Sequence, residues 1–316
     1  MSNVERFPSN IFDPVEVKIK NYPRKMYRAN FRSLYDLRNY LTNNPEINHN
    51  CFPRLASERE GYDFAGESYE DTLKMIDGPI KEEFADFFTL QKKIDRSSFE
   101  FVKEYVSTKS VAGGVIDIPS LVTGSPLCYV SEKEVFEPKF IRLNLLLSYY
   151  CGTSKSQVKN RALIVTALIN ALEREGYVVD VNTFAVSKEG KELMNINVNI
   201  KNSNQTLNKA NLIKSLCYVE FFRRLIFRVK ETLDVKDEEW GDGYGVTCDK
   251  DEILELLKLS KDDIFVDQPR ELCIYGRNLV EDFDNAVKFL GIGDKIDVKE
   301  SRDNIKRQVK VLSKNL

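Results

Sequence analysis

Hydrophobic and polar positions follow a readable order in the middle of the chain. A short, mostly apolar run over residues 140–147 predicts a strand covered on both faces, as in parallel sheets. The small polar residues 148–156 form a loop before a helix over residues 158–172, which is apolar around most of its circumference and therefore buried. Residues 177–186 predict a second strand, and residues 194–200 alternate between apolar residues and asparagine, as an antiparallel edge strand does. The short connection between these two strands requires a hairpin, since a parallel return needs about a dozen residues or more.

This order of strand, helix, strand and antiparallel strand resembles the opening of a von Willebrand A-type domain. We therefore expect an α/β fold with a three-layer, Rossmann-like, von Willebrand A-like mixed sheet and an antiparallel edge hairpin. In metal-binding A-type domains, the loop after the first strand carries Asp-x-Ser-x-Ser, whose oxygens bind a hard divalent cation. Here Ser148, Tyr150 and Gly152 occupy those positions. A hydroxyl is a poor replacement for a carboxylate, so we expect no metal and no cofactor.

The sequence before this unit predicts a helical region, and the sequence after it predicts a continuation of the core. Residues 1–30 mix prolines with basic residues and predict an extended arm, and helical spacing follows over residues 31–41. We assign residues 1–110 to an N-terminal arm and helical region, which makes the first hundred residues mainly helical. Residues 111–316 form the α/β core, which ends in a helix over residues 279–290.

Composition and charge narrow the class of protein. Hydrophobic residues make up 42% of the chain and charged residues 30%, which predicts a folded core rather than disorder. The formal net charge of −2 argues against a globally basic nucleic-acid binder, though not against a local basic patch. No stretch reaches the ~18 apolar residues that cross a bilayer, so we expect no membrane partner. The N-terminus does not have the pattern of a signal peptide, and the six scattered cysteines fit free thiols in a reducing cytosol.

The sequence contains a single histidine, His49, in an asparagine-rich loop. That count excludes a two-histidine metal site, and any Ser-His or Cys-His catalysis would have to use His49. We interpret His49 as a solvent-exposed loop residue and expect a protein without enzymatic activity.

One candidate site lies at the start of the buried helix. Thr153, Ser154 and Ser156 place hydroxyls and backbone N–H groups at a helix N-terminus, where a phosphate or carboxylate can bind. The favoured interpretation is that these residues simply cap the helix.

A second candidate is the set Asp117, Glu137 and Lys139. Metal-dependent nucleases use two carboxylates on Mg²⁺ and a lysine near the attacked phosphate. Asp117 lies in a short predicted strand that Pro119 stops, and Pro138 disfavours a central strand position. We therefore favour a solvated lead-in to the next strand.

A third candidate is the basic segment that contains Arg223, Arg224 and Arg228. Arginines among aromatic residues can contact phosphates and stack on bases. The favoured interpretation is an amphipathic element with its aromatic residues buried and its arginines in water.

Five short segments complete the picture: FAGESYED at 64–71, AGGVIDIP at 112–119, GSPLC at 124–128, ALEREGY at 171–177 and FRRLIF at 222–227. Together they are similar to a family of uncharacterised bacteriophage proteins. The resemblance implies a phage or prophage origin and the cytoplasm of the infected bacterial host. It implies no catalytic residue.

Our leading hypothesis is a phage-encoded, cytosolic, non-enzymatic protein. It would be a protein-interaction module on a metal-free A-type scaffold, with a protein partner or a second copy of itself. The alternative is a nucleic-acid-binding or Mg²⁺-dependent nucleic-acid-processing protein that uses the arginine segment or the Asp117 set.

Overall fold

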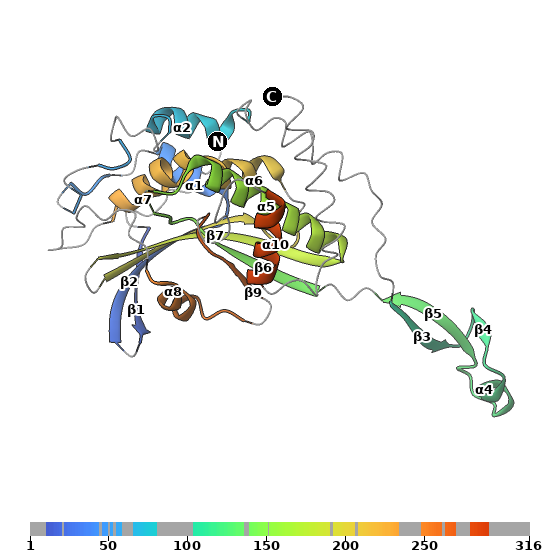
Figure 1. Ribbon diagram of the computed structural model, residues 1–316. Coiled ribbons are helices and arrows are strands. Elements are labelled where there is room, and N and C mark those ends of the chain that lie inside the picture. Colours follow the sequence, from blue (N-terminus) through green and yellow to red (C-terminus); the bar gives the residue numbers. More distant parts are fainter. Residues whose placement is uncertain are drawn as a thin grey trace, which may run out of the picture.

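The computed structural model describes residues 11–20, 22–43, 46–49, 51–52, 55–58, 66–80, 104–135, 139–150, 152–189, 192–205, 208–233, 248–260, 263–269 and 279–290. Their strands form a six-stranded mixed sheet in the order β1-β2-β8-β7-β6-β9 and a three-stranded antiparallel sheet in the order β3-β5-β4 (Figure 1). The strands are β1 (Asp13–Ile19), β2 (Tyr22–Phe31), β3 (Glu104–Ser110), β4 (Val115–Ile116), β5 (Tyr129–Val135), β6 (Lys139–Leu146), β7 (Tyr177–Glu189), β8 (Glu192–Lys201) and β9 (Asp263–Val266).

Helices cover both faces of the six-stranded sheet, and each face has its own hydrophobic cluster. The alternation along β8 explains this, because Met194 and Ile196 enter the larger cluster while Leu193 enters the smaller one. The smaller cluster packs between the sheet and α8, and the other helices of the main body lie on the opposite face (Figure 1). The helices are α1 (Leu34–Thr42), α2 (Tyr69–Asp77), α4 (Ile118–Val122), α5 (Lys155–Arg174), α6 (Lys209–Leu216), the π-helix η2 (Phe221–Ile226), α7 (Phe227–Glu231), α8 (Lys250–Leu257) and α10 (Leu279–Leu290).

The mixed α/β architecture predicted from the middle of the chain is confirmed. β6, α5, β7 and β8 follow one another as expected, with β6 parallel to β7 and β7 antiparallel to β8. The helix α5 is buried as its apolar circumference predicted, and Ile164, Ile169 and Leu172 are fully buried. The predicted helices at residues 31–41 and 279–290 correspond to α1 and α10.

The prediction that β8 is an edge strand is wrong. β2 pairs with β8 in parallel, from Lys25 opposite Glu192 to Phe31 opposite Val198, so the hairpin lies inside the sheet. Asn195 is buried, whereas Asn197 and Asn199 are partly exposed. The Asn197 side-chain amide donates to Asn30 Oδ1 at 2.7 Å.

The prediction of an extended arm and a mainly helical N-terminal region is wrong for residues 13–31. These residues form the β1-β2 hairpin, which joins the sheet of the α/β core. Prolines suit this place because Pro14 lies on an edge strand and Pro23 lies near the start of β2, where the sheet tolerates a missing N–H donor. The domain boundary at residue 110 stays a prediction.

The three-stranded sheet lies apart from the six-stranded sheet in Figure 1. β3 pairs with β5 along its full length, and the two-residue strand β4 pairs with the other side of β5. The short helix α4 follows β4 and includes Pro119 in its first turn. This unit therefore presents its outer surface well away from the main helices.

Candidate interaction surface

At the N-terminus of α5, the hydroxyls serve mainly to cap the helix. The Gln157 backbone N–H donates to Ser154 Oγ at 3.2 Å, and the Ser154 N–H donates to Gln157 Oε1 at 3.0 Å, which completes a capping box. The Ser156 hydroxyl lies 2.9 Å from Ser154 Oγ. Thr153 is buried, and its Oγ1 has no hydrogen-bond partner among the described residues. An anion at this position stays a prediction.

Replacing Ser154 with alanine tests the capping interpretation. We expect the free energy of unfolding to fall by about 1 kcal/mol, because Ser154→Ala leaves the Gln157 N–H without its acceptor. Urea denaturation with and without phosphate measures the change, with Ser156→Ala as the matched control. A loss that depends on phosphate would instead support an anion site.

The basic segment folds as η2 and α7, with two of its arginines turned into the protein. Arg224 and Arg228 are each 5% exposed. Arg224 Nε donates to the Glu67 carbonyl oxygen at 2.8 Å, and its Nη1 donates to the Ser57 carbonyl oxygen at 3.0 Å. The expectation that these arginines lie in water is wrong, because both guanidinium groups are buried and donate to oxygen atoms of the protein. Neither group offers a cationic surface to nucleic acid.

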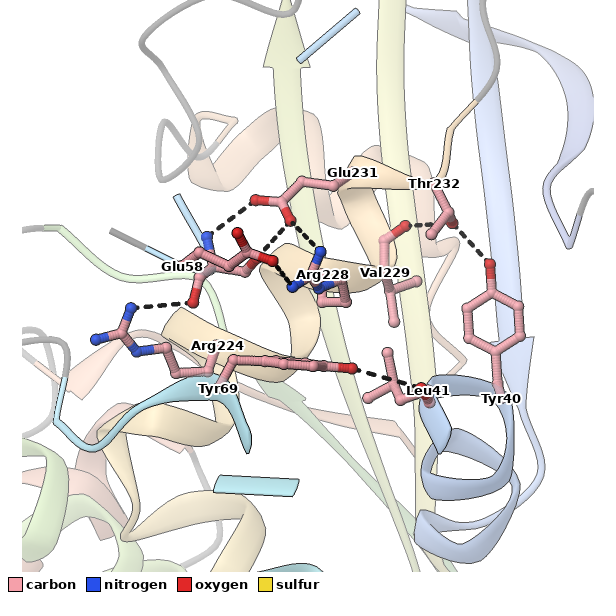
Figure 2. A network of polar contacts seen from close by, with 10 residues as sticks. Tyr40, Leu41, Glu58, Tyr69, Arg224, Arg228, Val229, Glu231 and Thr232 are labelled. Carbon is pink, nitrogen blue, oxygen red and sulfur yellow. Dashed lines mark hydrogen bonds and ion pairs between the residues drawn. The ribbon is translucent and has the colours of Figure 1, made fainter. Parts of the chain in front are cut away.

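A buried ionic network connects α7 to the segments around residues 57–69. Figure 2 shows Arg228 between the carboxylates of Glu58 and Glu231, with which it forms ion pairs. Glu231 is fully buried and accepts hydrogen bonds from the backbone N–H and the hydroxyl of Ser57. Arg228 also stacks on Tyr69, with its guanidinium carbon 4.3 Å from the ring centroid. Burial raises the pKa of Glu231, and the bonds from Ser57 oppose that rise.

An aromatic layer beside this network surrounds Arg223 and Lys230. The Phe222 ring centroid lies 5.0 Å from both the Tyr149 and the Phe227 centroids. Arg223 packs over Tyr149, with 5.5 Å between its guanidinium carbon and the ring centroid. Lys230 is 2% exposed, and its Nζ lies 5.4 Å from the Phe227 centroid. Burial lowers the pKa of Lys230 from 10.5 to about 7.

The structure describes two members of the nuclease set, Asp117 and Lys139. Asp117 pairs with Lys109 of its own small sheet, at 2.7 Å between Lys109 Nζ and Asp117 Oδ2. Lys139 begins β6 and lies over Tyr177, with its Nζ 5.9 Å from the ring centroid. Glu137 lies outside the described residues, so the convergence of all three stays a prediction.

The loop after β6 uses its hydroxyl within the protein. Ser148 is buried and donates to the Val186 carbonyl oxygen at 3.1 Å. Across the described ranges, no group of three or more histidine, cysteine, aspartate or glutamate side chains is placed to hold a metal ion. None of the helices that the structure describes is long and apolar enough to cross a membrane. His49 is exposed, as its loop predicted.

The end of the small sheet exposes aliphatic side chains, and we call this surface the apolar tip. Eleven large hydrophobic side chains are exposed among the described residues, and seven of them lie here, on β4, α4 and the adjoining turns. Such a concentration is unusual, because scattered single residues are the norm on a soluble surface. The seven side chains, each between 44% and 80% exposed, are Val111, Val115, Ile116, Ile118, Leu121, Val122 and Leu127.

Polar and backbone contacts fix the shape of the apolar tip. The Asp117 carboxylate accepts a hydrogen bond from the Ser120 hydroxyl at 2.6 Å and pairs with Lys109, which connects α4 to the end of β3. The hydrogen bond from Lys109 is the main reason that the pKa of Asp117 is lowered. Gly114 has a φ of +84°, and a Cβ there would lie 2.3 Å from the Val130 carbonyl oxygen. Only glycine permits this close approach to β5.

Sequence reasoning missed both the apolar tip and the Glu231 network. Pro119 marks the end of a predicted strand, but a proline in the first turn is also a helix-start signal, and α4 begins beside it. Glu231 lies three residues after Arg228, a spacing that favours a pair on a helix. The other partner, Ser57, is 174 residues away, so no local pattern points to it.

Comparison with known proteins places the chain in a family. A family model described as a domain of unknown function, DUF7192, matches residues 13–286. No match was found among the curated proteins or among the solved structures. The matched region runs from β1 into α10 and includes both sheets and the apolar tip. The chain therefore belongs to the DUF7192 family.

Proposed function

We propose that this protein is a non-enzymatic interaction module that binds a protein partner through the apolar tip. The observation that carries the proposal is the concentration of seven exposed aliphatic side chains on one small unit. Contact between such a surface and water is unfavourable, and covering it with protein removes the unfavourable contact. Because Asp117 is already paired with Lys109, the partner surface that fits the tip is uncharged and apolar.

We also propose that the module is built on a von Willebrand A-like scaffold. A helical crossover from β6 to β7 and a hairpin from β7 to β8 form the combination on which the resemblance to von Willebrand A-type domains rests. The bond from Ser148 to Val186 supports a loop that works without metal. Phage origin and the cytoplasm of an infected bacterium rest on the resemblance of the five short segments to phage proteins. Nucleic-acid binding remains the alternative, and salt-dependent retention of single-stranded DNA would support it.

A charged residue in the apolar tip tests the proposal. We expect Leu121→Asp to weaken partner binding by about 30-fold or more, because the partner would have to bury a carboxylate that has no counter-charge. The measurement is affinity capture with the full-length protein, identification of the partner, and titration of the two purified proteins. Leu121 is 51% exposed, so its replacement leaves the main fold intact.

Phe140→Asp is the matched control for this experiment. Phe140 is 57% exposed and lies on β6, outside the apolar tip. We expect the control to bind like the wild type. Equal partner affinity for wild type and Leu121→Asp would contradict the proposal.

A further inference from the structure

We infer that the apolar tip binds the apolar tip of a second copy of this chain, as a two-fold symmetric dimer. This inference rests on the proposed function, because it names the occupant of the same surface. The first argument is how little of the small unit is buried. Burial is described over residues 107–131 of this unit, and within that range one residue is buried, Cys128. Units shorter than about 40 residues usually depend on disulfides, metals or oligomerisation.

Disulfides and metal sites, the first two of these stabilisers, are absent from the described residues. Cys128 is a free cysteine, and no described group of side chains is placed to hold a metal ion. Association is the remaining stabiliser, and a second copy is present whenever the chain itself is made. A dimer covers the exposed aliphatic surface of both small units at once, so each copy supplies the other with a core.

The charge of the apolar tip favours a copy over a membrane or a nucleic acid. Residues 110–128 contain one charged residue, Asp117, and its partner Lys109 neutralises it. Two such tips meet without like-charge repulsion. Anionic lipids and phosphate backbones are recognised by clustered lysine and arginine, and residues 110–128 contain neither.

The placement and area of the tip fit a weak dimer. The small sheet extends away from the six-stranded sheet, so two copies can meet at their tips while the main sheets stay apart (Figure 1). A two-fold contact uses the same patch on both copies, which the shared apolar surface permits. Seven side chains at roughly 60 Å² each would bury about 840 Å² over both copies, below the ~1,200 Å² of standard interfaces. We therefore expect association in the micromolar range.

Sedimentation equilibrium of the full-length protein tests the inference. We expect wild type to show a monomer–dimer equilibrium with a Kd of about 10 μM. The variant with Ile118→Asp and Val122→Asp should have a Kd at least about 30-fold higher, because both carboxylates would enter the contact without a counter-charge. These side chains are 67% and 80% exposed, and circular dichroism checks that the variant is folded. Phe140→Asp, outside the tip, should dimerise like wild type.

Three results would overturn the inference. The first is a wild type that stays monomeric up to about 200 μM, far above the expected Kd. The second is a dimer that the Ile118 and Val122 changes leave unaffected. The third is a monomer that pellets with vesicles of phosphatidylcholine and phosphatidylglycerol through the tip. A monomeric wild type whose Leu121→Asp variant still loses its partner would leave the proposed function standing, so the two ideas fail separately.

Discussion

Replacing Lys230 with methionine is expected to raise the free energy of unfolding near pH 6 by about 5 kcal/mol and to remove most of its pH dependence between pH 7 and about pH 9. Burial lowers the pKa of Lys230 from 10.5 in the unfolded chain to about 7 in the folded protein. Between these values the unfolded state binds the proton that the folded state has lost, so wild-type stability rises with pH. Below pH 7 the folded protein must bury the ammonium group, and the full loss of stability is present.

Urea denaturation at pH 6, 7, 8, 9 and 10 measures this dependence. Burial also raises the pKa of Cys248 from 9.0 and of Tyr69 from 10.0 to about 12, so at the alkaline end the unfolded chain loses protons that the folded protein keeps. These two groups lower stability as the pH rises there, so the slope due to Lys230 is read between pH 7 and about pH 9. The exposed lysine Lys155 supplies the control variant Lys155→Met, which should keep the wild-type slope. An unchanged slope in Lys230→Met would show that Lys230 is not the source of the pH dependence.

Truncating Glu231 should be the most damaging change in the ionic network. We expect Glu231→Ala to lower the free energy of unfolding at pH 7 by about 3–5 kcal/mol. The variant leaves Arg228 without its buried counter-charge. It also removes the carboxylate oxygens that accept hydrogen bonds from the backbone N–H and the hydroxyl of Ser57. Equilibrium denaturation in urea gives the value directly.

Glu58 supplies the matched control for this prediction. Its carboxylate pairs with the same Arg228, but its side chain is 49% exposed, so solvent can replace it. We expect Glu58→Ala to cost less than about 1 kcal/mol. Similar losses in the two variants would contradict the view that burial makes Glu231 important.

The middle of the main sheet could be predicted because its elements are consecutive and each has its own period. β6, α5, β7 and β8 follow one another, and a short connection fixes the direction of β8. The pairing of β2 with β8 could not be predicted in this way. It joins Met26 to Leu193 across most of the chain, and no local spacing encodes such a contact.

The candidate sites were harder to predict because burial is a property of the whole fold. Arginine is usually exposed, which led to the wrong expectation for Arg224 and Arg228. Their burial depends on Ser57, Glu58 and Glu67, which come from distant segments. The exposure of the apolar tip could not be predicted either, because aliphatic residues are usually buried. The sequence alone does not show whether other parts of the protein cover them. By contrast, Ser154 carried a local capping signature, and its role followed from sequence alone.

The π-helix η2 preserves the rotational phase of the helix that follows it. A π-helical turn completes one turn with an extra residue compared with an α-helical turn, and each residue of an α-helix advances the side chains by about 100°. Loss of one residue within Phe221–Ile226 would convert the π-turn into an α-helical turn without rotating α7, so Glu231 would still face Ser57 and Lys230 its aromatic layer. Loss of one residue at the start of α7 would instead rotate the residues after it by about 100° and disturb these contacts together. The π-turn is therefore the place in this segment where a change of length can be absorbed.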